Sequence, residues 1–268
     1  MAAELYVHID SADVKLEGEL ARRFPNVNVL TSSKRLGPGG GRHRCLQVCS
    51  TPYAVSFDDD SYPVDADFFG RVVQLFAENP RAAIFGASIW CQHEREKPRV
   101  ESLVRTPSYV GCGYAIRVAA YRRMRGYLAR PVSYGMEETD LSIQLFAAGW
   151  DIYQAGDLRV IHDTDLKHHE SPEVTAGALT NAGLCMFLNY PMILWGWGIA
   201  QVANLVVFFI RLGRFSGIWS GILQIPSACY RNRQHRKPIP WRTLKNYLQF
   251  RRRASSQRSR SGDYFRLR

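Results

Sequence analysis

Three consecutive aspartates, Asp58, Asp59 and Asp60, follow directly after the apolar run 53–57. Their negative charges repel one another, and a divalent cation that prefers oxygen ligands, such as Mg²⁺ or Mn²⁺, would offset that repulsion. The same cation would neutralise the charge of a diphosphate leaving a substrate. A solvated turn whose aspartates cap the next helix also explains the triplet, and for these three residues alone it is the favoured interpretation.

A second acidic group consists of Glu137, Glu138 and Asp140 and opens an expected helix. Acidic residues in the first turn are stabilised by the helix macrodipole, so capping alone accounts for them. The functional alternative is a general base that accepts a proton from an acceptor hydroxyl, with its pKa raised by the neighbouring carboxylates. His162 ends an apolar run, where a neutral imidazole could join a metal site or play a structural part.

Short apolar runs alternate with amphipathic stretches, which predicts a doubly wound α/β sheet with a ligand crevice at the carboxyl ends of its strands. We expect strands at 5–9, 27–30, 53–57, 83–89 and 158–161, and helices at 16–24, 66–78, 117–127 and 139–148. Residues 36–42, Leu-Gly-Pro-Gly-Gly-Gly-Arg, are interpreted as a loop that permits close backbone approach and leads into a helix ending at residue 48.

In combination, these motifs resemble those of family 2 glycosyltransferases with the GT-A fold. The resemblance covers residues 4–165. It rests on the order of a strand ending in Asp10, a Gly-rich segment ending in Arg42, Asp-Asp-Asp-Ser, Gly-Cys-Gly, Met-Glu-Glu-Thr-Asp-Leu and Val-Ile-His. It implies a Rossmann-like mixed sheet flanked by helices, and inverting transfer of a sugar from a nucleoside diphosphate sugar to a hydroxyl of a glycan or lipid-linked acceptor.

The resemblance also implies roles for individual residues. Those that would bind the nucleotide sugar are Asp10, Arg42, Asp58 and Asp59. Those that would hold Mg²⁺ or Mn²⁺ are Asp60 and His162. The catalytic base would be Glu138, with Glu137 as its partner in the motif. The acceptor side would be formed by Gly111, Cys112, Gly113 and Asp140.

The chain departs from the family at its start. Relatives begin with a β-α unit of about thirty residues before the strand that residues 5–9 resemble, and the strand of that unit lies in the middle of the sheet. Its absence would leave backbone groups of the flanking strands unpaired. We therefore predict either that the native start codon lies upstream or that the chain is a remnant with weak or no activity.

The C-terminal part is apolar and then basic. Residues 174–210 contain no charged side chain, and 191–210 has the length of a membrane-spanning helix. Residues 231–268 carry 13 lysines and arginines and one acid. Because one span would separate the catalytic domain from this tail, we expect a hairpin, re-entrant or peripheral attachment at the cytoplasmic side of the cell membrane. A buried helical pair with a solvated tail is the alternative.

Three parts are therefore expected: a GT-A-like catalytic domain over 1–172 that is incomplete at its N-terminus, an apolar helical membrane-associating region over 173–230, and a basic tail over 231–268. The expected partners are the nucleoside diphosphate sugar, the acceptor and a membrane. Nucleic acid is not among them, because residues 1–230 are nearly neutral and the tail has no RNA-binding motif. Two other functions stay open: an inactive membrane-associated remnant or binding module, and a metal-dependent nucleotidyltransferase.

Overall fold

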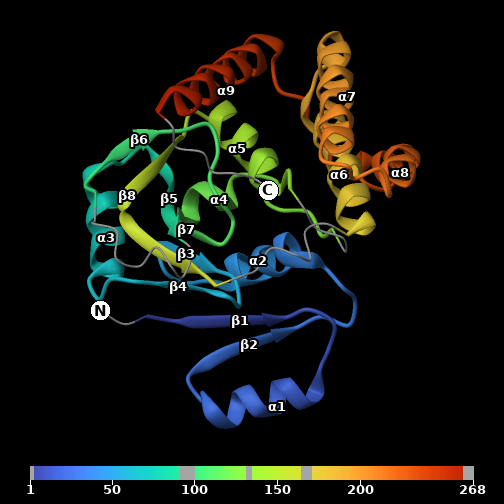
Figure 1. Cartoon of the computed structure of the whole chain (residues 1–268). Helices are drawn as coiled ribbons and strands as arrows, with labels where there is room; N and C mark the ends of the chain where they lie inside the picture. The colour runs from blue at the N-terminus through green and yellow to red at the C-terminus, as the bar shows by residue number, and fades with distance from the viewer. Residues whose placement is uncertain (1–2, 91–99, 131–134, 164–170, 262–268) are drawn as a thin grey trace.

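The computed structural model describes residues 3–90, 100–130, 135–163 and 171–261. Its main sheet has six strands in the order β3–β7–β5–β8–β4, with β6 paired to β8 (Figure 1). These strands are β3 (Tyr53–Phe57), β4 (Ser61–Pro63), β5 (Ala82–Trp90), β6 (Leu103–Arg105), β7 (Gly113–Arg117) and β8 (Asp151–His162). Only the β5–β8 pair is parallel among the described pairs of this sheet, so the sheet is mixed, as the resemblance implied.

Helices cover both faces of the main sheet. They are α2 (Gly37–Val48), α3 (Phe68–Glu78), α4 (Val118–Arg122) and α5 (Glu137–Ala147). Neighbouring residues of β5 point to opposite faces: Ile84 packs in a core with Leu141 of α5, and Phe85 packs in a core with Phe68 and Phe76 of α3. The expected α/β architecture, a mixed sheet flanked by helices, is therefore confirmed.

A second sheet consists of β1 (Leu5–Ile9) and β2 (Val27–Thr31), which pair in parallel around α1 (Val14–Arg23). The strands of the expected mixed sheet are therefore divided between two sheets. Within the described residues, β1 pairs only with β2, and β3 pairs only with β7, so each has one open edge. These are the two strands on either side of the position where the sequence analysis expected a strand to be missing.

The Gly-rich segment is helical and does not form the predicted loop, because α2 begins at Gly37. The Asp10 carboxylate accepts hydrogen bonds from the backbone amides of Leu36 and Gly37, at 2.6 and 2.9 Å, and so caps the helix from a distant strand. The glycines serve close packing: a Cβ at Gly41 would lie 2.7 Å from Nδ1 of His8 on β1. Local sequence signals do not contain a cap of this tertiary kind.

The C-terminal part contains four helices, α6 (Pro172–Asn189), α7 (Trp195–Arg211), α8 (Ile218–Arg231) and α9 (Trp241–Ser261). The predicted basic tail is thus largely a helix. On α9, Leu244 and Tyr247 are buried, and the Tyr247 hydroxyl donates to the carbonyl of Pro107 at 3.0 Å. Among the described helices, the stretch Met192–Arg211 alone has the length and apolar composition to cross a membrane, with mean hydropathy 1.8.

Candidate active site

The aspartate triplet lies in the turn between β3 and β4. Ser61, directly after the triplet, accepts a hydrogen bond from the Asp58 amide at 2.7 Å and donates one to the Cys112 carbonyl at 2.6 Å. This buried hydroxyl joins the triplet to the Gly-Cys-Gly segment, which precedes and enters β7. Sequence reasoning overlooked Ser61, although a hydroxyl immediately after three acids was a signal available to it.

The two residues expected to bind a metal lie side by side. β4 pairs antiparallel with β8 so that Ser61 faces His162, and this register brings Asp60 Oδ1 to 3.2 Å from His162 Nε2. A carboxylate oxygen and an imidazole nitrogen form a donor set that suits Mn²⁺ or another divalent cation. Within the described residues, no group of three His, Cys, Asp or Glu side chains could hold a metal. An ion at Asp60 and His162 would therefore need further ligands from substrate or water.

Arg42 of α2 connects the triplet to the acidic first turn of α5. Its guanidinium donates to Glu137 Oε1 at 3.0 Å and forms an ion pair with Asp58. The side chains of Arg42 and Glu137 are only 10% and 7% exposed, so water screens these charges weakly. The resemblance assigned Arg42 to nucleotide-sugar binding, and its position between two carboxylates was not foreseen.

Glu138 lies against Gly111. A Cβ at Gly111 would clash with Glu138 Oε1 and would lie 3.2 and 3.3 Å from the two terminal nitrogens of Arg42. Burial, reinforced by the Glu137 carboxylate and opposed by Arg42, raises the pKa of Glu138 to about 7. A carboxylate with this pKa is suited to accept a proton near neutral pH.

The turn before α5 sets the direction of these acids. Gly135 and Met136 both adopt left-handed backbone conformations, each with φ of 73°. Such a conformation is uncommon for a residue with a side chain, and it is found more often at functional sites. The helix can therefore begin at Glu137 and present both glutamates toward Arg42 and Gly111.

Asp140 lies on the same helix but is only 1% exposed. It accepts hydrogen bonds from the side chains of Arg125 and Asn189, and Arg130 Nη2 lies 3.6 Å from its other oxygen. Both carboxylate oxygens are engaged, which favours a structural role that fastens α5 to α6. Its assignment to the acceptor side remains a prediction.

The remaining predicted residues surround this centre in different ways. Asp10 caps α2, as described above, and Asp59 is exposed. Cys112 is buried, and burial raises the pKa of its thiol to about 12, so it is protonated at neutral pH and does not act as a nucleophile. Gly113 begins β7, where a Cβ would lie 2.9 Å from Ile89.

A buried row of tyrosines was missed entirely by sequence reasoning. The Tyr109 and Tyr127 hydroxyls are hydrogen-bonded to each other, and Tyr127 donates to the Tyr114 hydroxyl at 2.8 Å. Burial raises the pKa of all three phenols, so they stay neutral. No periodic signal in the sequence could have brought together residues from separate segments.

A mixed sheet with acidic residues at its strand ends and an acidic helix start facing them is the architecture of a GT-A glycosyltransferase. Solved structures share this fold. The crystal structure of GalNAc-T7 with UDP, GalNAc and Mn²⁺ is 15% identical, with a TM-score of 0.56 over 71% of this chain and 42% of that chain. The mannosyltransferase PcManGT from Pyrobaculum calidifontis, in complex with GDP-Man and Mn²⁺, is 14% identical, with a TM-score of 0.51 over 91% and 75% of the two chains.

S. aureus TarS 1-349 is also similar, at 14% identity and a TM-score of 0.51 over 98% of this chain and 83% of that one. The family model for Glycosyl transferase family 2 matches residues 8–132, whereas no curated protein matches the sequence. The matched residues make up just under half of the chain, and they include the Gly-rich segment, the aspartate triplet and Gly-Cys-Gly, on which the resemblance rests. The matched range ends before Glu138 and His162, and the chain spans less than half the length of GalNAc-T7.

Proposed function

We propose that the protein is an inverting glycosyltransferase that moves a sugar from a nucleoside diphosphate sugar to a hydroxyl of a glycan or lipid-linked acceptor. One observation carries the proposal: Arg42 joins Asp58, beside the expected donor site, to Glu137, beside the expected base. The donor and acceptor halves of the reaction would thus share one electrostatic centre.

In this mechanism, Glu138 accepts the proton of the acceptor hydroxyl. The hydroxyl oxygen forms a bond to the anomeric carbon while the bond from that carbon to the diphosphate oxygen breaks, and the nucleoside diphosphate leaves with the bonding electrons. No covalent intermediate is required. Because the pKa of Glu138 is about 7, its carboxylate is sufficiently basic to take the proton and is largely ionised just above neutrality.

Asp60 and His162 would hold Mg²⁺ or Mn²⁺, and such an ion, when bound, neutralises the charge that develops on a departing diphosphate. The 3.2 Å separation of their donor atoms supports this assignment. GalNAc-T7 and PcManGT were both solved with Mn²⁺. Asp10, Asp58 and Asp59 are proposed to contact the nucleotide, and the segment Gly111–Gly113 is proposed to line the acceptor side.

A second candidate, an inactive remnant or binding module, is favoured by one feature. The open edges of β1 and β3 leave the sheet divided beside the expected nucleotide site. An enzyme with this division would hold its donor less firmly than one with a continuous sheet.

The two candidates are distinguished by donor binding and product release. The full chain is mixed with UDP, GDP or dTDP sugars and with Mn²⁺ or Mg²⁺, and thermal protection and nucleotide release are measured. We expect metal-dependent protection that Asp60→Asn abolishes and Glu138→Gln retains, together with release of nucleoside diphosphate that Glu138→Gln lowers by about 10²- to 10⁴-fold.

The control variant is Glu78→Gln, an exposed acid at the end of α3, which should behave as the unchanged protein. Absence of protection with every donor would favour the binding module. Release of pyrophosphate would identify a nucleotidyltransferase. Undiminished turnover of Glu138→Gln would remove that residue from the mechanism.

We further propose that the enzyme works at the cytoplasmic side of the cell membrane, where a nucleotide sugar and a lipid-linked acceptor can meet. The uncharged residues 174–210 and the following basic residues support this location.

A further inference from the structure

Helices α7 and α8 expose apolar side chains that a self-contained domain would bury. More than half of the residue surface is exposed at Trp197, Trp219 and Leu223 on these helices, and at Met192, Ile193 and Phe215 in the segments that precede α7 and α8. Over the most apolar window of Met192–Arg211, only 11% of the residues are buried. These helices are therefore not a buried core pair, and their outer surface requires a partner from outside the described chain.

Both helices are fixed from one side, by α6. A Cβ at Gly198 of α7 would clash with Met186, and Tyr190 donates to Gln201 at 2.8 Å. On α8, the Gly221 carbonyl accepts a hydrogen bond from the Thr180 hydroxyl at 3.0 Å. Figure 1 shows α7 and α8 on the side of α6 that faces away from the main sheet. The apolar surface thus belongs to one outward-facing helical layer that packs on α6.

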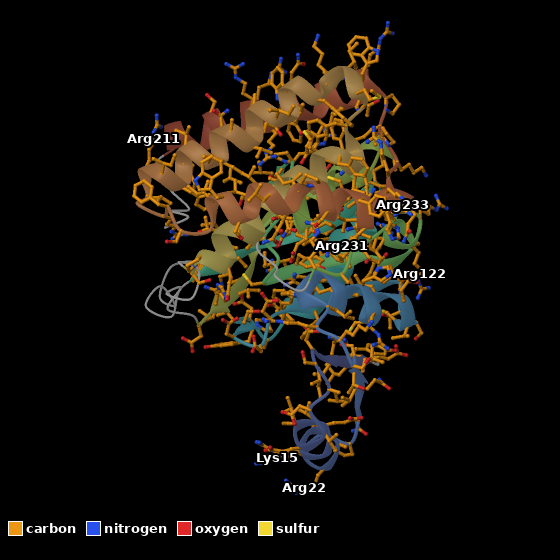
Figure 2. The ribbon with its side chains drawn as sticks, turned by 90° about the vertical axis from the view of Figure 1, so that its right-hand side faces the viewer. Lys15, Arg22, Arg122, Arg211, Arg231 and Arg233 are labelled. Atoms are coloured by element: carbon orange, nitrogen blue, oxygen red, sulfur yellow. The ribbon has the colours of Figure 1, made fainter. Side chains whose placement is uncertain are left out.

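The charged residues of α7 and α8 are all cations, and the acid Glu173, at the start of α6, lines a pocket with Ser220 and Gln224 of α8. From Val174 to Gly262 the sequence contains no aspartate or glutamate. Arg211 lies at one end of the layer and Arg231 and Arg233 lie at the other, as Figure 2 shows, and all three are exposed. An apolar surface bordered by cations is complementary to anionic lipid, whereas two copies meeting through this face would bring like charges together.

The cations at the two ends of α7 indicate how this helix is oriented relative to a bilayer. Arg211 closes its C-terminal end, and the Arg236 guanidinium lies 5.5 Å from the ring centroid of Trp195 at its N-terminal end. A spanning helix would place these cations on opposite sides of the bilayer. A helix lying in the interface keeps both at the level of the lipid phosphates, with its apolar side chains below them.

We propose that α7 and α8 form a docking surface for an anionic bilayer and lie in the plane of its interface. This inference gives a definite form to the membrane association proposed above and does not depend on the reaction catalysed. The exposed tryptophans and aliphatic side chains enter the acyl boundary, and Arg211, Arg231 and Arg233 contact lipid phosphates. Because α6 is fastened to α5 through Asn189 and Asp140, the layer is held at a set position relative to the glutamates of the site.

The test is co-sedimentation of the full chain with vesicles of phosphatidylcholine alone or of phosphatidylcholine with phosphatidylglycerol. We expect binding to the anionic vesicles only, with release at high salt. The double variant Trp219→Ser, Leu223→Ser should bind at least about tenfold more weakly. Its control is Val14→Ser, Phe24→Ser, which changes two exposed apolar residues on and beside α1 and should bind as before.

The cations are tested in the same assay. Arg211→Glu, Arg231→Glu should weaken binding by about fivefold or more for each charge. The control Lys15→Glu, Arg22→Glu changes two exposed cations of α1, which Figure 2 shows at the opposite end of the molecule. Thermal protection by nucleotide sugar, measured on every variant, should not change, so a failure of docking is distinct from a failure of catalysis.

Four outcomes would overturn the proposal. The first is equal binding of the apolar variant and its control, or of both vesicle types. The second is a requirement for detergent after extraction of cell membranes with salt and alkaline carbonate, which would indicate a span. The third is a dimer in solution that Trp219→Ser dissociates, and the fourth is tighter binding to an oligonucleotide than to anionic vesicles.

Discussion

The active-site region and the α7–α8 layer differ in which side chains are buried and which are exposed. Around Arg42, charges are buried and paired, with Glu137 only 7% exposed. On the α7–α8 layer, Trp219 is 76% exposed and Arg211 and Arg231 also face solvent. A buried charge needs a partner inside the chain, because desolvation without one is costly. An exposed apolar layer needs a partner outside the chain. The active-site charges therefore find their partners within the protein, whereas the α7–α8 layer depends on another molecule.

The same contrast occurs within one turn of α5. Asp140 accepts hydrogen bonds from Arg125 and Asn189 and forms an ion pair with Arg130. Glu138, in contrast, lies against Gly111 and next to a second glutamate. The first environment provides cations and a hydrogen-bond donor for the carboxylate. The environment of Glu138 excludes water and places the negative charge of Glu137 nearby, and both effects raise the pKa of Glu138 to about 7. Proton transfer is therefore expected at Glu138, and structural support at Asp140.

The largest effect on stability is expected from Arg42→Met. It leaves Asp58 and Glu137 without their shared cation, and removal of one partner of a buried ion pair costs about 3–5 kcal/mol. Urea unfolding measures the change. Arg22→Met, at an exposed position, is the control and should change the free energy of unfolding by less than about 0.5 kcal/mol. Equal stability of the two variants would mean that the Arg42 ion pairs contribute nothing to the fold.

Gly111→Ala should lower turnover by about 10²-fold, because the new methyl group displaces Glu138 from its position. Steady-state kinetics with the best donor measures this loss. Gly70→Ala on α3 is the matched control, since nothing lies within 4 Å of a Cβ there. A Gly111→Ala enzyme with full activity would show that Glu138 is free to move without consequence.

Asp140→Asn should destabilise the fold by about 2 kcal/mol, since Arg125 and Arg130 lose their carboxylate partner. Turnover per folded molecule should stay nearly unchanged. Thermal unfolding and kinetics on the same sample separate these effects. If turnover fell while stability held, Asp140 would belong to the acceptor side, as the sequence resemblance implied.

The last prediction concerns the dependence of stability on pH. The folded-state pKa of Glu138, about 7, lies above its ordinary value of 4.5, so the folded chain binds this proton more tightly than the unfolded chain. The resulting stabilisation is complete below pH 4.5 and is lost as pH rises through 7. Glu138→Gln should therefore lose less stability than the unchanged protein as pH rises from 4.5 through 7, while turnover of the unchanged protein falls below pH 7. Identical stability curves across pH 5–9 would contradict a raised pKa at Glu138.

Much of the fold could be predicted because period and composition are local properties. The strands at 5–9 and 53–57 and the helix that begins with the acidic group lie where the sequence indicated, whereas the strand that reaches His162 begins already at Asp151 and not at the predicted residue 158. The Gly-rich segment was predicted wrongly because its helix is capped by Asp10, a residue 26 and 27 positions away from its two donors. The helix in the basic tail was not predicted, because the sequence there is dominated by charged residues and only two residues, Leu244 and Tyr247, are deeply buried.

By itself, the sequence determined the kinds of chemistry that the protein can carry out: carboxylates at strand ends, an acidic helix start, and an uncharged segment beside a basic one. Only the tertiary structure decided which carboxylates are paired with a cation, since Arg42 contacts Asp58 and Glu137, which lie 16 and 95 residues away in the sequence. Residue spacing specifies which side chains share a strand or helix face. The pKa of a buried group, and the side of a helix left uncovered, depend on neighbours that only folding brings together.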